Sequence, residues 1–194
     1  ELYTKGENME VKNKEITDLT ITAMLTAIGI LIPAIMPIRL VLGTASYTLA
    51  SHVPLNIAMF RSPISAFVVA VGTTIGFILS GMNIFIVLRA LSHLIYASFG
   101  ALYLKKFPNT LKSSKSRFMF SFIINLIHGI SEVVVVYSLT MLGPDPMTAN
   151  FLQNLFLLVG LGTLVHGMVD FEIAYRISSL IQRRTKFKLT ELAM

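Results

Sequence analysis

Six apolar runs, separated by short polar or basic stretches, constrain the fold of this chain more than any single motif does. They are residues 19–36, 46–60, 64–79, 84–104, 118–142 and 151–181. About 20 mostly apolar residues suffice to cross the hydrocarbon core of a bilayer. Hydrophobic residues make up 54% of the chain and charged residues only 13%, too few to cover the surface of a water-soluble domain. We therefore predict an all-α integral membrane protein with six transmembrane helices.

The six runs define one transmembrane domain, residues 18–184. A polar segment, residues 1–17, precedes it, and residues 185–194 are expected to form a cytoplasmic tail. We expect no cleavable signal peptide, since the first run is long enough to remain in the membrane, and residues 1–8 can include a cloning scar. The run 46–60 is short and contains His52, Pro54 and Asn56, whereas 151–181 must tilt or extend beyond the membrane.

Basic residues set the orientation of the bundle. Alternate loops and the two ends hold 14 of the 16 lysines and arginines, and the opposite loops (37–45, 81–83 and 143–150) hold Arg39 alone. Loops rich in lysine and arginine stay in the cytoplasm and contact anionic lipid headgroups. Both termini are therefore predicted to be cytoplasmic. The same distribution argues against a nucleic-acid-binding face.

Small residues mark the places where helices can approach closely. Gly72 and Gly76 form a G-x-x-x-G pair on one face of the third run, which favours helix packing within the chain over a contact with another subunit. Ala23 and Ala27 form a weaker pair of the same spacing in the first run.

Polar side chains inside the last three runs fall on single helical faces. Ionisable groups are costly in the hydrocarbon region unless they face a partner or a cavity, so each one is a candidate for a site. The set comprises Arg89, His93 and Tyr96, then Asn125, His128 and Glu132, and finally His166 and Asp170. Buried ion pairs that hold the bundle together are one explanation, with Arg89 paired to Glu132 or Asp170. A polar pocket for a hydrophilic solute explains the whole set better. Glu132, Asp170 and Glu172 could instead lie near the ends of the helices.

Catalysis and metal binding find little support in the sequence. The chain has four histidines, but no two of them have the i, i+4 spacing of a helical metal site, and cysteine is absent. Neither H-E-x-x-H nor G-x-S-x-G occurs, and there is no Walker A motif for ATP. We therefore expect no catalytic residue, no metal site and no cofactor bound by this chain.

The chain resembles the S components of energy-coupling-factor (ECF) transporters. The resemblance lies in the six runs within about 190 residues, the cytoplasmic termini and the Ala23–Ala27 pair. Residues 37–60 (PIRLVLGTASYTLASHVPLNIAMF) look like the family's first outer loop and second helix. Residues 86–101 (IVLRALSHLIYASFGA) look like its fourth helix. Together the resemblance covers residues 18–184.

The resemblance implies a non-catalytic subunit in a bacterial plasma membrane that captures a water-soluble vitamin outside the cell. Its partners would be a transmembrane T component, docked at Ala23 and Ala27, and two ATPase subunits that use ATP and Mg. It implies lid roles for Arg39 and Tyr47. The implied pocket residues are Arg89, His93, Tyr96, Asn125, His128 and His166.

The vitamin and the mode of transport stay open at this point. The sequence looks closest to the branch that handles niacin or cobalamin, and does not separate the two. The cobalt and nickel S components use a histidine near the N-terminus, whereas the first histidine here is His52. A solitary proton-coupled transporter that uses Glu132, Asp170 and the histidines is the main alternative. A lipid-modifying membrane enzyme is a further one, for which no catalytic residues are apparent.

Overall fold

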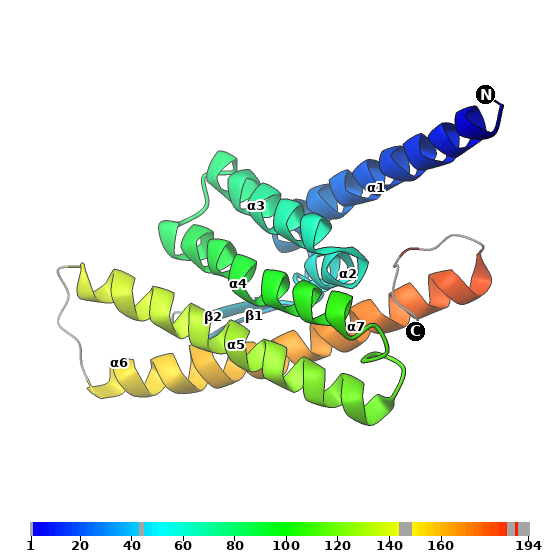
Figure 1. The fold of residues 1–194 in the computed structure, drawn as a ribbon. Helices are drawn as coiled ribbons and strands as arrows, with labels where there is room; N and C mark the ends of the chain where they lie inside the picture. Colours follow the sequence, from blue (N-terminus) through cyan, green and yellow to red (C-terminus); the bar gives the residue numbers. More distant parts are fainter. Residues whose placement is uncertain (1, 43–44, 144–148, 186–188, 190–194) are drawn as a thin grey trace.

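The computed structural model describes residues 2–42, 45–143, 149–185 and 189, and shows a helical bundle with one β-hairpin (Figure 1). The elements are α1 (Leu2–Ile35), β1 (Arg39–Leu42), β2 (Ala45–Thr48), α2 (Val53–Arg61), α3 (Pro63–Leu79), α4 (Ile84–Lys106), α5 (Ser114–Met141), α6 (Ala149–Asn154), the π-helix η1 (Leu155–Leu161) and α7 (Gly162–Arg184). Helices α6, η1 and α7 follow one another directly and form one continuous segment, so the described residues contain six helical segments.

Four of these segments are long and apolar enough to cross a membrane: Asn13–Ile35 of α1, then α4, α5 and Asn150–Arg184. The apolar helix α3 has 17 residues and is slightly shorter. Large apolar side chains such as Leu79, Ile95 and Phe156 are exposed along the outer faces of the helices. Together with the four candidate spans, a surface of this kind is typical of helices that face lipid, so the predicted helical membrane protein is confirmed.

The second apolar run differs from the single helix that its sequence predicts. The structure divides it into strand β2, a turn at residues 49–52 and the nine-residue helix α2. Nine residues rise about 14 Å, less than half of the hydrocarbon core, so α2 alone cannot cross it. All nine are buried, because α2 lies between α1, α3, α4 and α7 (Figure 1).

The loop expected at residues 37–45 is partly a hairpin, in which β1 and β2 pair antiparallel with Arg39 opposite Thr48. The turn that follows the hairpin enters the bundle. Non-helical backbone is tolerated at membrane depth only where protein groups satisfy it. Here the carboxylate of Asp170 on α7 accepts hydrogen bonds from the backbone N–H groups of Ala50 and His52, each at 2.9 Å. This anchor places His52 in the interior, immediately before α2.

The glycine pair of α3 packs within the chain, as predicted. A Cβ atom on Gly72 would lie 2.6 Å from Cγ2 of Thr26, and one on Gly76 would overlap the side chain of Ile30. Both neighbours belong to α1, so the two glycines let α1 and α3 approach closely. By contrast, Ala23 and Ala27 are exposed on another face of α1.

The first and last helices are both longer than a membrane crossing requires. Helix α1 continues through the polar N-terminal residues and projects from the bundle (Figure 1), so this segment is an extension of the first helix. The helical run from Asn150 to Arg184 has 35 residues, about 50 Å of helix, which confirms that it must tilt or extend beyond the bilayer. Most of the loop before it, residues 144–148, lies outside the described residues.

Several basic residues of the predicted cytoplasmic face make ion pairs at the ends of helices. Arg61, at the end of α2, contacts Asp18 of α1 and donates to the carbonyl oxygen of Leu189 at 2.8 Å. Glu172 on α7 pairs with Arg117 at 3.4 Å and with Arg176 at 2.8 Å. Glu172 therefore lies at the partly exposed end of the bundle, whereas Glu132 and Asp170 are buried.

Candidate functional site

The carboxylate of Glu132 is the point where α4, α5 and α7 meet, and its side chain is only 2% exposed. Its Oε2 accepts hydrogen bonds from Nη2 of Arg89 on α4 at 2.8 Å and from Oγ1 of Thr163 on α7 at 2.6 Å. Its Oε1 lies 3.1 Å from Nε2 of His93. A buried carboxylate needs such partners, since its desolvation otherwise costs several kcal/mol. Of the two pairings open to Arg89, the structure shows the one with Glu132.

The carboxylate of Asp170 forms a second buried centre, one helix away. Besides the two backbone N–H groups of the turn, its Oδ2 lies 3.1 Å from Nδ1 of His52 and 3.4 Å from Nε2 of His166. The negative charge faces the N-terminal end of α2, where the helix dipole favours an anion. Asp170 therefore fixes the backbone of the turn and the ring of His52 together.

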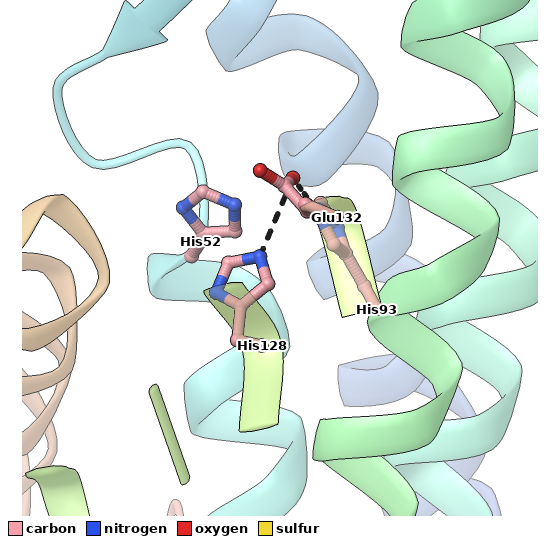
Figure 2. Close-up of side chains that lie close together, drawn as sticks. All are labelled: His52, His93, His128 and Glu132. Carbon is pink, nitrogen blue, oxygen red and sulfur yellow. Dashed lines mark hydrogen bonds and ion pairs between the residues drawn. The ribbon is translucent and has the colours of Figure 1, made fainter. Parts of the chain in front are cut away.

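The four histidines of the chain lie between these two carboxylates and form what we call the histidine cluster (His52, His93, His128 and His166). The ring of His52 lies 4.8 Å from the rings of both His93 and His128 and 5.1 Å from that of His166, measured between centroids. Figure 2 shows His93 and His128 directed at Glu132, with His52 beside His128 and near the same carboxylate. Distant segments of the sequence thus supply one buried group of imidazoles.

A cavity of about 110 Å³ opens beside the histidine cluster. Its polar wall consists of Arg89, His93 and Glu132, of Thr73 on α3, and of Thr48, Ser51 and His52 from the hairpin and its turn. Its apolar wall is larger and comes from helices α1 to α4 and the loop between α3 and α4. The apolar lining residues are Gly29, Pro33, Leu55, Ala70, Phe77, Met82, Ile86 and Ala90. A partly open space with an apolar wall and a few convergent polar groups is typical of a small-molecule site.

Two of the pocket residues expected from the sequence, Arg89 and His93, line the cavity, whereas Tyr96, Asn125, His128 and His166 are not among its lining residues. Tyr96 is fully buried and stacks on His128 with ring centroids 4.4 Å apart. Asn125 donates to the carbonyl oxygen of Ser121 at 2.8 Å and packs against Gly167. His166 contacts Ser51 and Asp170.

The two residues expected in the lid belong to the hairpin. Tyr47 lies on β2, and its hydroxyl donates a hydrogen bond to the carbonyl oxygen of Leu158 in η1. A π-helix changes the ordinary i, i−4 pairing of the backbone and is frequent near functional sites. Tyr47 therefore fastens the hairpin to the last membrane helix. The side chain of Arg39 lies outside the described residues.

The cavity also has walls that the sequence does not predict. Thr48 ends strand β2, Ser51 and His52 lie in the turn that follows it, and Gly29, Ala70 and Phe77 come from α1 and α3. Arg89 was identified as a candidate because it is an ionisable residue inside an apolar run. The same criterion applies to His52 and Glu132. No periodic pattern marks the turn, because Asp170, 120 residues away from Ala50, determines its position.

The chain is 42% identical over 174 residues to "Niacin transporter NiaX" of Lactococcus lactis subsp. cremoris (strain MG1363). The match covers 90% of this chain and 78% of the relative. No family model matches the chain, and no solved structure matches it.

The ion pair of Arg89 and Glu132 provides the first prediction. Arg89→Gln should destabilise the protein by roughly 3–5 kcal/mol, because it leaves a buried carboxylate without its cation. Glu132→Gln should destabilise it as well. The double variant should be less destabilised than the sum of the two, by roughly 0.5–3 kcal/mol of coupling. Reversible denaturation in detergent micelles measures all three.

Arg176→Gln is the matched control, since Arg176 is 77% exposed and pairs with Glu172 in solvent. It should cost at most about 1 kcal/mol. Strict additivity of the Arg89 and Glu132 substitutions would show that the two side chains do not depend on each other.

Proposed function

The chain belongs to the niacin-type S components of ECF transporters, and on this premise we propose that it binds niacin outside the cell and hands it to partner subunits for uptake. It is a multi-pass protein of a bacterial plasma membrane. The single observation that carries the choice of niacin is the 42% identity to a niacin transporter over most of both chains. The structure adds two supporting arguments, the size of the cavity and the charge of its wall.

The size of the cavity favours niacin over cobalamin. A dry cavity of roughly 150 Å³ can hold one benzene ring, so a cavity of about 110 Å³ suits a single aromatic ring after small side-chain movements. Cobalamin carries a corrin macrocycle and a nucleotide tail and would need a space many times larger. Small ligands gain at most about 1.5 kcal/mol for each heavy atom. A molecule of roughly nine heavy atoms can therefore reach a Kd of about 1 nM, sufficient for capture from dilute medium.

Nicotinate, the anionic form of niacin, combines a flat ring with one carboxylate, and the cavity offers a surface for each. Among the described residues that line the cavity, Arg89 is the only lysine or arginine. One of its terminal nitrogens bonds to Glu132, while its Nε has no hydrogen-bond partner among the described residues. We assign the carboxylate to Arg89 and His93, and the ring to the apolar wall around Phe77, Ile86 and Ala90. An arginine can bind a carboxylate through two parallel hydrogen bonds.

The other expected site residues have supporting parts in this proposal. Tyr96, Asn125, His128 and His166 hold the polar wall from behind. The hairpin with Arg39 and Tyr47 covers the cavity as a lid. This role is supported by Thr48, Ser51 and His52, which belong to the hairpin and its turn and line the cavity.

Filling the cavity should abolish niacin binding without unfolding the protein. Ala90→Leu adds three heavy atoms at a buried position of the wall and should weaken nicotinate binding at least 100-fold, about 2.7 kcal/mol. Isothermal titration calorimetry of the purified chain measures the affinity. Ala34→Leu, at an exposed position of α1, is the matched control and should bind normally. Normal affinity in Ala90→Leu, or binding of cobalamin by the unaltered chain, would overturn the assignment.

We further propose that Ala23 and Ala27 form the surface that docks on the T component, with two ATPase subunits providing the energy. Their exposure supports this proposal, because neither alanine is covered by another part of the described chain. Small side chains allow two helices in a membrane to come close together.

Replacing Ala27 by tryptophan should therefore block assembly and leave niacin binding intact. The bulky indole would separate the helix backbones, so co-purification with the T component should fall at least tenfold. Calorimetry on the isolated chain should give the same affinity as before. Leu91→Trp, on the exposed face of α4, is the control and should assemble normally. A variant at Ala27 that assembles normally, or uptake that needs a proton gradient but no ATPase, would refute this arrangement.

Six crossings with both termini in the cytoplasm complete the proposal. The hairpin and its turn together with α2 would form the second crossing, from an outer hairpin to Arg61 on the cytoplasmic side. The pairing of Arg61 with Asp18, near the beginning of the first membrane helix, supports this arrangement.

Labelling of single cysteines tests the topology cleanly, because the chain has no cysteine of its own. In intact cells an impermeant maleimide should modify Asp145→Cys and should not modify Lys112→Cys until the membrane is opened. The reverse pattern would invert the proposed orientation.

A further inference from the structure

The histidine cluster contains an arrangement that niacin recognition by Arg89 does not explain. His52, His93, His128 and Glu132 each offer one donor atom, and these four atoms all lie within 4.8 Å of one another (Figure 2). The donors come from the turn after the hairpin, from α4 and from α5. We propose that they form a binding site for a divalent transition-metal ion of the zinc class, at the wall of the cavity.

The distances between donors agree with this assignment. Ligands at 2.0–2.2 Å from a tetrahedral ion lie about 3.3 Å from one another. Oε1 of Glu132 lies 3.1 Å from Nε2 of His93 and 3.5 Å from Nε2 of His128. Three imidazoles and one carboxylate are a ligand set that suits zinc and its neighbours in the periodic table. Small side-chain rotations would bring His52 to the same distance.

The neighbours of these donors are already oriented as in metal sites. A histidine that binds a metal commonly donates its other N–H to a carboxylate, which fixes the ring. Nδ1 of His52 lies 3.1 Å from Asp170, which leaves Nε2 available to an ion. Oε2 of Glu132 is held by Arg89 and Thr163, which leaves Oε1.

His128 provides the observation that points most directly to a missing ligand. Its side chain is 0% exposed, and its Nε2 reaches Oε1 of Glu132 only at 3.5 Å, so within the part of the chain that the structure describes neither ring nitrogen makes a close hydrogen bond. A buried polar group without a close partner loses its hydration and gains no hydrogen bond in return. Coordination of an ion by Nε2 would offset much of this loss.

The charge of the cluster agrees with a divalent ion. With neutral histidines, Arg89 contributes one positive charge, and Glu132 and Asp170 contribute one negative charge each. Bound nicotinate would add a third negative charge, and a divalent ion would then make the group neutral. This charge balance rests on the proposed function, whereas the donor geometry does not.

The inference departs from the expectation that the chain binds no metal. That expectation came from spacing along the sequence, which reveals only ligands on one helix. Here the i, i+4 pair is His128 with Glu132 on α5, and the remaining donors come from other segments.

Cobalt(II) titration of the full chain tests the site without niacin. The protein is purified without a polyhistidine tag, stripped with EDTA and titrated with Co²⁺ alone. One equivalent should bind, with the visible absorption of four-coordinate cobalt, and Zn²⁺ should displace it. Absence of saturable binding in the unaltered chain would overturn the proposal, whatever the behaviour of the variants.

Substitutions then locate the ion. His128→Gln and His93→Gln should each weaken Co²⁺ binding at least 100-fold. His166→Gln is the matched control, since it makes the same change in the same cluster outside the four donors, and it should weaken binding less than tenfold. Loss of binding in His166→Gln together with normal binding in His128→Gln would place the ion at Asp170 and refute this site. Equal weak binding in all variants would show non-specific association only.

Niacin calorimetry on the same samples separates this inference from the proposed function. Niacin binding without any Co²⁺ site would leave the vitamin assignment intact and reject the metal. A Co²⁺ site in a chain that does not bind niacin would support the metal site and reject the vitamin assignment.

Discussion

The low polarity of the membrane interior is the constraint on which the rest of this structure depends. Each charge or free backbone group in that interior must find a partner within the protein. Glu132 meets this requirement with Arg89, Thr163 and His93, and thereby connects α4, α5 and α7. Asp170 meets it with the backbone of residues 50 and 52, and thereby holds an irregular turn inside the bundle. The positions of both carboxylates therefore determine where the cavity can lie.

The parts of the fold that depend on local pattern could be predicted from the sequence. The apolar runs predicted five of the six helical segments, and most of the predicted ends lie within a few residues of the observed ones. The start of α1 is the exception, because this helix extends into the polar N-terminal segment. Helical periodicity placed Arg89 and His93 on one face, and Glu132 on the facing side of α5, as their contact confirms. The spacing of Gly72 and Gly76 likewise indicated close packing, which α1 provides.

The parts that depend on distant contacts could not be predicted in this way. The run 46–60 is apolar enough to resemble a short helix, yet contacts with α7 divide it into a strand, a turn and α2. Ala50 adopts a positive φ of 65°, a conformation that alanine alone would not favour and that the surrounding bonds of the turn maintain. His52 reaches the cluster only because of this turn, so its role was invisible in the spacing of the histidines.

The composition of the cluster also argues for a role beyond stability. Replacement of a buried ion pair by well-packed apolar residues is often neutral or stabilising. A bundle selected for stability alone would therefore have little reason to keep seven ionisable side chains (Arg89, Glu132, Asp170 and the four histidines) in one group. Here four of them (His52, Arg89, His93 and Glu132) line a cavity, and atoms such as Nε of Arg89 and both ring nitrogens of His128 lack close hydrogen-bond partners among the described residues. Unpaired donors and acceptors of this kind lower stability when the site is empty and raise affinity when it is filled, because the incoming group then completes the hydrogen bonds that the fold has left open.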